Sequence, residues 1–181
     1  GYFSCRDPQF SFDVEGRPLG ALTAPVNLGI YPGLNKPTIV KDGCIGTQSV
    51  ELRGATRGYS GESVFVEHGG FVGPDLILQK DSIHCLTFCH KYFKGLAGTT
   101  ATIEIYSESP YELIGYKTFT NPGVWEETSI MVMPTSDKYR VYFRNITSDP
   151  LDVPGTVRLD NIRIGKKQFI KDITPPVINC P

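Results

Sequence analysis

The segment whose residue types could most readily do chemistry holds two cysteines and two histidines within seven residues: His84, Cys85, Cys89 and His90. Zinc binds such side chains at ~2.0 to 2.3 Å from one ion. The aromatic Phe88 inside the segment favours a strand. On a strand the two cysteines share one face, about 13 Å apart at ~3.3 Å per residue, and both histidines point to the other face. One ion cannot collect all four side chains, so we expect no zinc site here.

The same spacing limits how the five cysteines can pair. Bridged Cα atoms lie ~4.4 to 6.8 Å apart, which excludes a Cys85–Cys89 disulfide. Two pairings of the first four cysteines stay open. They are Cys5–Cys85 with Cys44–Cys89, and Cys5–Cys89 with Cys44–Cys85. We expect the fifth cysteine, Cys180, to belong to a following module.

No catalytic residue emerges from the other candidate motifs. The segment Gly58-Tyr59-Ser60-Gly61 lacks the Gly-x-Ser-x-Gly spacing of a nucleophile elbow, and no strand-turn-helix pattern surrounds it. A glycosidase needs two carboxylates facing a cleft, and spacing alone singles out no pair among 19 acids. We therefore expect a protein that is not an enzyme.

Residues 157–164 contain an acid at a change of pattern. Val157 and Leu159 would face one side of a regular strand, and Ile162 and Ile164 the other, because side chains repeat with period two. A bulge at Asp160-Asn161 would absorb the shift, bend the strand and redirect the Asp160 carboxylate. The alternative is a last strand covered on both faces, with no special role for Asp160.

The triplet Asn145-Ile146-Thr147 is the one acceptor sequence for N-glycosylation in the chain. We expect a glycan on Asn145 at an exposed strand end. Together with the cysteines, this triplet predicts a protein that is secreted or on the extracellular face of the cell surface.

Composition excludes several partners. The 181 residues carry 18 basic and 19 acidic side chains, a net charge of -1 that favours neither nucleic acid nor an anionic membrane. The chain contains no run of about 18 apolar residues, which is the length needed to cross a membrane. The start of the chain has no signal-peptide pattern, so we expect that a signal peptide has been removed or that the chain is a fragment.

Short strand-like runs bounded by turn residues recur along nearly the whole chain, and none keeps a helical period. This spacing predicts an all-β antiparallel sandwich. One face is apolar in several runs, as in Tyr139, Val141 and Phe143. We expect strands at 10–14, 38–40, 46–52, 63–67, 76–79, 84–93, 100–106, 111–119, 125–133, 139–145 and 156–164.

The 157–164 strand resembles the closing strand of galactose-binding-like jelly rolls, the family that includes MAM domains and many carbohydrate-binding modules. The Cys85-Leu86-Thr87-Phe88 strand and Trp125 are similar to features of MAM domains, so the resemblance spans about residues 84–165. It implies a jelly-roll fold. It also implies another pairing, Cys5–Cys44 with Cys85–Cys180, which leaves Cys89 free.

In this family the acid of the closing strand often helps to hold a structural calcium ion. The resemblance implies calcium ligands at the matching positions here, which are Asp13, Glu15, Asp42 and Asp160. Calcium takes six to eight oxygen ligands from carboxylates and carbonyls. The alternative is that Asp13, Glu15 and Asp42 are solvated acids of turns.

The composition changes near the end of the chain. Residues 173–181, Ile-Thr-Pro-Pro-Val-Ile-Asn-Cys-Pro, resemble the opening of a hyalin-repeat (HYR) module. We therefore expect a jelly-roll domain over 1–172, and a linker with the start of a further extracellular module over 173–181.

These features favour a non-catalytic adhesion or recognition module of a larger protein that binds protein, including a second copy of itself, or glycan. The alternative is a carbohydrate-binding module attached to an extracellular carbohydrate-active enzyme. Sugar binding needs exposed aromatic residues, and no single residue stands out. The candidates are Tyr59, Tyr106, Tyr111, Tyr116 and Tyr142.

Overall fold

A computed structural model describes residues 2–4, 10–22, 28–29, 37–66, 80–108, 110–136, 139–166 and 168–170. These residues form strands and no helix. The strands are β1 (Tyr2–Ser4), β2 (Phe10–Phe12), β3 (Gly20–Ala21), β4 (Leu28–Gly29), β5 (Thr38–Val40), β6 (Ser49–Arg53), β7 (Ser63–Val66), β8 (His84–Phe93), β9 (Thr102–Glu108), β10 (Glu112–Thr118), β11 (Glu126–Val132), β12 (Arg140–Asn145), β13 (Thr156–Lys166) and β14 (Gln168–Ile170).

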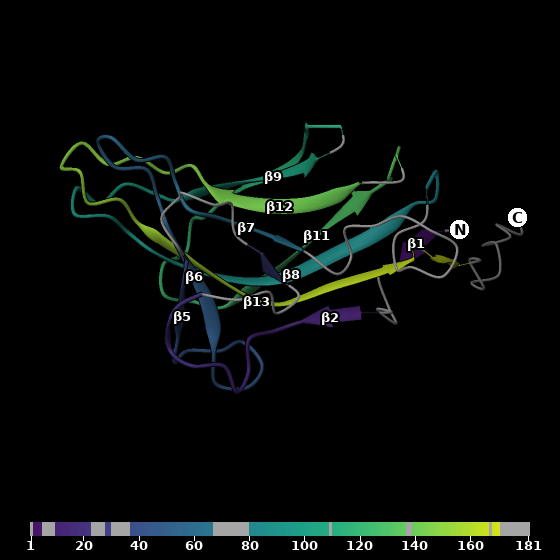
Figure 1. The fold of residues 1–181 in the computed structure, drawn as a ribbon, viewed down its shortest axis with the longest axis horizontal. Coiled ribbons are helices and arrows are strands. Elements are labelled where there is room, and N and C mark those ends of the chain that lie inside the picture. Colours follow the sequence, from purple (N-terminus) through teal and green to yellow (C-terminus); the bar gives the residue numbers. More distant parts are fainter. Residues whose placement is uncertain are drawn as a thin grey trace, which may run out of the picture.

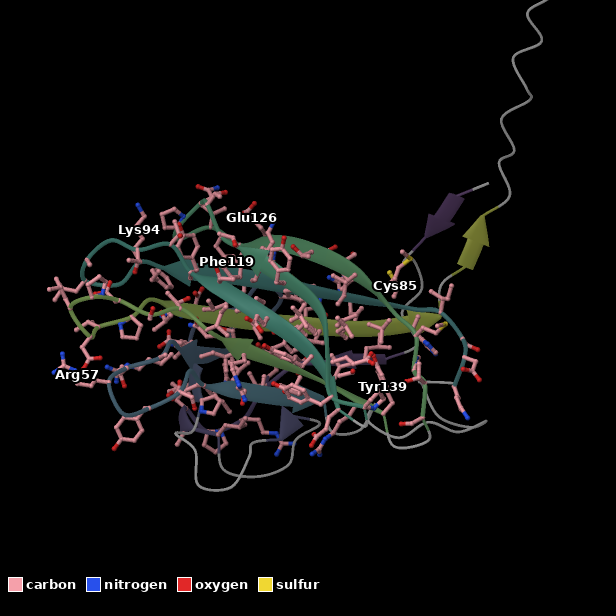
Figure 2. All side chains as sticks on the ribbon, turned by 90° about the horizontal axis from the view of Figure 1, so that it is seen from above. Arg57, Cys85, Lys94, Phe119, Glu126 and Tyr139 are labelled. Atoms are coloured by element: carbon pink, nitrogen blue, oxygen red, sulfur yellow. A yellow bond between two sulfur atoms is a disulfide. The ribbon has the colours of Figure 1, made fainter. Side chains whose placement is uncertain are left out.

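Two antiparallel sheets face each other. The five-stranded sheet has the order β10-β9-β12-β7-β4, and the seven-stranded sheet has the order β11-β8-β13-β6-β5-β3, with β2 also paired to β13. Figure 1 shows β9 and β12 in one layer and β8 and β13 in the other. A small pair, β1 with β14, lies beyond the end of the sandwich (Figure 2). The predicted all-β jelly-roll sandwich is confirmed.

The core lies between the two layers. Phe88 of β8 and Phe143 of β12 meet edge to face with ring centroids 5.1 Å apart, and this contact joins the two sheets. Tyr92 stacks on Phe119 at 5.4 Å, and Phe119 is buried inside the sandwich (Figure 2). Burying a large aromatic side chain contributes roughly 1.5 to 3 kcal/mol, so these rings anchor the packing of the sheets.

Strand alternation sets which side chains reach the core. Val141 and Phe143 of β12 are buried in the core cluster, whereas Arg140 and Arg144 on the same strand are only partly buried. The predicted apolar face of residues 139–145 is confirmed, and residues 101–105 alternate in the same way, with Ala101, Ile103 and Ile105 in the core. The side chains at the alternate positions of β9 and β12, between these core residues, therefore face outward from the five-stranded sheet.

The predicted bulge in β13 is also confirmed. The pairing of β13 with β8 shifts between Asp160 and Arg163, and Asn161 has a left-handed φ of 47°. The extra residue restores the inward phase, so the apolar residues on both sides of the bulge face one core. These residues are Val157, Leu159, Ile162 and Ile164.

Most predicted strands appear within a few residues of their expected bounds. The predicted strand at 76–79 and the expected module junction at 173–181 lie outside the described residues. Within the described part of the chain, no helix has the length and apolar character needed to cross a membrane.

Candidate functional site

The outer face of the five-stranded sheet gathers tyrosines and charged residues from three adjacent strands. In one cross-strand row, Tyr106 of β9 lies opposite Leu113 of β10 and Tyr142 of β12. In the next row, Glu104 of β9 lies opposite Tyr116 of β10 and Arg144 of β12. Directly opposed residues share a face of the sheet. An aromatic row therefore runs beside a polar row.

Three of these tyrosines form a packed group. The ring of Tyr106 stacks on Tyr111 and on Tyr142, each with centroids 5.1 Å apart, and Tyr111 lies 6.1 Å from Tyr142. Tyr142 is buried and Tyr106 is half-buried, whereas Tyr111 and Tyr116 are 61% and 70% exposed. The buried ring of Tyr142 and the half-buried ring of Tyr106 thus support the exposed ring of Tyr111. We call Glu104, Tyr106, Tyr111, Tyr116, Tyr142 and Arg144 the tyrosine face.

Arg144 is the cation of this face. Its guanidinium carbon lies 6.0 Å from the ring centroid of Tyr106 and 5.9 Å from that of Tyr142, within the range of cation–π attraction. Its Nε is buried and has no hydrogen-bond partner. Four residues before it on the same strand and the same face, Arg140 forms an ion pair with Glu108 at 2.6 Å. The face thus offers flat apolar rings next to hydrogen-bonding groups, which is the chemistry that a sugar ring with its hydroxyl groups requires.

Four of the five tyrosines predicted as sugar-binding candidates lie on this face. The fifth, Tyr59, is 61% exposed and lies outside these strands, in the turn closed by hydrogen bonds between Thr56 and Tyr59. Sequence reasoning missed Glu104 and Arg144 as site residues. The available signal was the polar parity of residues 102–108 and 140–145, but only the pairing of β9 with β12 brings the two charges side by side.

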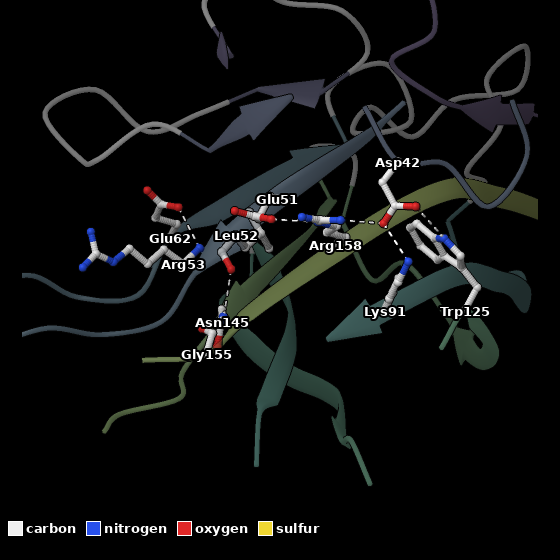
Figure 3. A network of polar contacts seen from close by, with 10 residues as sticks. All are labelled: Asp42, Glu51, Leu52, Arg53, Glu62, Lys91, Trp125, Asn145, Gly155 and Arg158. Atoms are coloured by element: carbon white, nitrogen blue, oxygen red, sulfur yellow. Dashed lines mark hydrogen bonds and ion pairs between the residues drawn. The ribbon is translucent and has the colours of Figure 1, made fainter. Parts of the chain in front are cut away.

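The outer face of the opposite sheet carries an ion-pair network, drawn in Figure 3. Asp42 accepts hydrogen bonds from Arg158 at 2.6 Å, Lys91 at 3.0 Å and the Trp125 indole at 3.3 Å. Arg158 also pairs with Glu51 at 2.7 Å. Burial acts to raise the pKa of Asp42, but these donors outweigh it and the pKa lies below its ordinary value. The acidic and basic side chains of this network therefore neutralise one another.

Asp160 lies at the bulge of β13, and its carboxylate is nearly buried. One oxygen accepts the backbone N–H groups of Cys44 at 2.8 Å and Ile45 at 3.2 Å, and the other accepts that of Asn161 at 2.8 Å. Burial raises the pKa of Asp160 above its ordinary value, against the effect of these donors, and the negative charge of Asp13 adds to the rise.

The other predicted calcium ligands have separate roles. Glu15 accepts the N–H groups of Thr47 at 2.8 Å and Gln48 at 2.7 Å, and the hydrogen bond from Gln48 is the main cause of its lowered pKa. Asp42 belongs to the ion-pair network. Among the described residues, no three acid, histidine or cysteine side chains come together in an arrangement that could hold a metal ion. The calcium site remains a prediction.

The structure contains a Cys44–Cys89 disulfide, with the two Cα atoms 6.3 Å apart. This bond selects one of the two pairings left open by the sequence and excludes the MAM-like pairing, in which Cys89 was free. Cys85 is also disulfide-bonded. Its expected partner, Cys5, lies outside the described residues, as does Cys180.

The predicted glycosylation site conflicts with the structure. Asn145 is completely buried, and its Nδ2 donates to the carbonyls of Leu52 at 2.9 Å and Gly155 at 3.2 Å (Figure 3). A glycan attached to this nitrogen would replace one of its two hydrogens, and so one of these bonds, and would have no room at a completely buried position. The triplet was expected at an exposed strand end, but β12 turns Asn145 inward, between strands of the two sheets.

The two histidines of the 84–90 segment lie on the strand face opposite the cysteines, as predicted, and the structure shows that this face points into the sandwich. His90 packs against Phe119 at 4.8 Å and hydrogen-bonds through Nε2 to Thr128 at 2.7 Å. Burial, with a contribution from the positive charge of Lys117, lowers its pKa to about 4. His84 is completely buried as well. Both are residues of the interior.

A scan with protein-family profiles and a search for curated relatives both find no significant match. Solved structures do match. The CBM22-1 xylan-binding domain of Paenibacillus barcinonensis Xyn10C shares 13% sequence identity, with a TM-score of 0.58 over 91% of this chain and 97% of that one. The C-terminal family 22 carbohydrate-binding module of Clostridium thermocellum Xyn10B shares 14%, with a TM-score of 0.59 over 91% and 96%.

A third structure, named as a xylan-binding domain from CBM 22, shares 13% identity with a TM-score of 0.60 over 92% of this chain and 99% of that one. At such identities the likeness establishes a common fold. This fold is the jelly-roll sandwich of carbohydrate-binding modules, and the coverage shows that the likeness extends over almost the whole domain.

Proposed function

We propose that this chain is a non-catalytic carbohydrate-binding module that binds a glycan chain on its tyrosine face. The observation that carries the proposal is the register of β10, β9 and β12. It places Tyr116, Tyr106 and Tyr142 on one face of the sheet, beside Glu104 and Arg144. Tyr111 stacks on the same group.

The physical fit is direct. The exposed rings of Tyr111 and Tyr116 can cover the apolar C–H face of a sugar ring, and rigid aromatic side chains lose little conformational entropy on binding. The neighbouring polar row supplies donors and acceptors for hydroxyl groups. The packed group of Tyr106, Tyr111 and Tyr142 is already formed, which lowers the cost of ordering the site.

The structural neighbours support this proposal and suggest a first ligand. Two of them are named as xylan-binding domains. The same fold in this chain makes xylan the first polysaccharide to test. We assign the chain no catalytic residue. Its role in this proposal is to hold an attached carbohydrate-active enzyme on its polysaccharide, outside the cytosol, where a disulfide such as Cys44–Cys89 persists.

The test is a glycan array followed by affinity electrophoresis in gels that contain the best polysaccharide. We expect Tyr116→Ala and Tyr111→Ala each to weaken binding by roughly tenfold, because each removes an exposed ring. The matched control is Tyr59→Ala, which removes an equally exposed tyrosine from another part of the surface. Retention of full affinity in both tyrosine-face variants would refute this location of the site.

The adhesion function expected from the sequence predicts a different outcome when the same purified protein is tested. An adhesion module would associate with itself or capture a protein, and the array would show no sugar-specific binding. Sedimentation velocity of the wild-type chain, with and without the best glycan, measures this directly. A stable dimer that ignores every glycan would favour adhesion over carbohydrate binding.

A further inference from the structure

Glu104 and Arg144 are opposed charges that do not pair. They lie directly opposite each other on β9 and β12, a position in which opposite charges normally attract. The charged pair at the other end of the same strands, Arg140 with Glu108, does form an ion pair. In the described part of the chain neither Glu104 nor Arg144 takes part in an ion pair.

Tyrosine stacking explains the separation. The guanidinium of Arg144 lies over the rings of Tyr106 and Tyr142, which belong to the neighbouring row of the same face. The buried Nε of Arg144 has no partner, and an unsatisfied buried donor costs free energy. The face therefore holds a strong donor and a strong acceptor next to each other, with neither satisfied by the other.

We propose that Glu104 and Arg144 together bind adjacent hydroxyl groups of an uncharged sugar unit, so that the ligand is a neutral glycan. This inference rests on the proposed carbohydrate-binding function. A hydroxyl group both donates and accepts. One hydroxyl donates to the Glu104 carboxylate, and its neighbour accepts from the Arg144 guanidinium. Tyr106 and Tyr142 act as positioning residues that hold the guanidinium apart from the carboxylate.

The charges of the face favour a neutral ligand over an acidic one. Arg140 and Glu108 neutralise each other, and Arg144 is balanced by Glu104. A carboxylate on the sugar would gain hydrogen bonds from Arg144. It would also approach Glu104, and two like charges repel at this range. An uncharged unit meets no such opposition and satisfies both side chains.

The experiment is isothermal titration calorimetry of the whole chain with xylohexaose and cellohexaose as neutral probes and hexagalacturonate as the acidic probe. We expect wild type to bind a neutral hexaose with an affinity that stays the same between about 0.05 and 0.5 M NaCl. Glu104→Ala and Arg144→Ala should each weaken that binding by roughly tenfold. In the double variant the losses should not add, because both side chains hold one sugar unit.

The matched control is Glu108→Ala, which removes a carboxylate from the same strand and the same face and should leave the affinity within about threefold of wild type. Thermal melts verify the fold of each variant. If Arg144→Ala does not fold, Arg144→Lys keeps the charge but loses the planar fork, and it should weaken binding while melting normally.

Three outcomes would overturn the inference. Neutral binding that is lost in Tyr116→Ala but unchanged in the Glu104 and Arg144 variants would leave the proposed function standing and remove this pair from it. Tighter binding of hexagalacturonate, strengthened further by Glu104→Gln, would assign Arg144 to carboxylate recognition. Absence of binding to every probe and to the glycan array would remove the proposed function together with the inference.

Discussion

Asn145 connects the two sheets through one side-chain amide. Its Nδ2 donates to two backbone carbonyls, of Leu52 in β6 and of Gly155 just before β13, while its Oδ1 accepts the N–H of Thr147 at 3.1 Å. All of these bonds are buried. A buried amide that satisfies three backbone groups contributes to stability chiefly because each group would otherwise be left without a partner.

We predict that Asn145→Asp lowers the free energy of unfolding by about 3 kcal/mol or more, because a carboxylate cannot donate to the two carbonyls and would repel them. Chemical denaturation measures the change. Asn121→Asp, in an exposed turn, is the matched control and should stay within about 0.5 kcal/mol of wild type. A loss below about 1 kcal/mol for Asn145→Asp would contradict the described hydrogen bonding.

The same geometry bears on glycosylation. Folded chains purified from a eukaryotic secretory pathway should carry an unmodified Asn145, since a glycan on Nδ2 cannot fit between the strands. Peptide mass mapping decides the point. A fully occupied Asn145 in stable, folded protein would show that this end of β12 opens in solution.

At the scale of single elements, the bulge in β13 lets the apolar residues before and after it face the same core. Its Asn161 adopts a left-handed backbone conformation, which asparagine and glycine tolerate better than β-branched residues do. We predict that Asn161→Val costs about 1 to 2 kcal/mol of stability, while Asn161→Gly changes it by less than about 1 kcal/mol. Urea denaturation of both variants, with Thr156→Val in the regular part of β13 as control, measures the difference. Equal stability of the valine and glycine variants would contradict the left-handed conformation.

The calcium site belongs to the same element, because it depends on where the bulge directs Asp160. If calcium binds the folded chain, a hundredfold excess over Kd should stabilise it by about 2.7 kcal/mol, and Asp160→Asn should abolish this gain. Differential scanning calorimetry in calcium and in chelator measures it. Melting that ignores both would refute the ion and leave Asp160 as the acceptor of three backbone N–H groups.

At the scale of the whole molecule, the sequence predicts those features that depend on local pattern. The alternation in 139–145 and the phase change in 157–164 predict the buried faces and the bulge, because strand periodicity and the need to bury apolar residues act over a few positions. The position of Arg144 opposite Glu104 and the burial of Asn145 depend on which strands pair. Residues distant in sequence decide such pairings, and no local pattern encodes them.

The interior also makes stability depend on pH through His90. In the folded chain its pKa is lowered to about 4 by burial and by the charge of Lys117, whereas an unfolded histidine titrates near 6.5. Between these values the unfolded chain binds a proton that the folded chain does not. The contribution of neutral His90 is therefore fully present above about pH 6.5 and is lost progressively as the pH falls towards about 4.

We predict that stability falls over this window by up to about 3 kcal/mol through His90 alone, since each unit of pKa difference corresponds to about 1.4 kcal/mol. Urea denaturation at half-unit steps of pH measures it for wild type and for His90→Gln, which cannot titrate. Subtracting the two curves removes the contributions of the acids and of His84, so the difference isolates His90. Parallel curves between pH 6.5 and 4 would show that His90 titrates alike in the folded and unfolded chains, and would contradict its burial between the sheets.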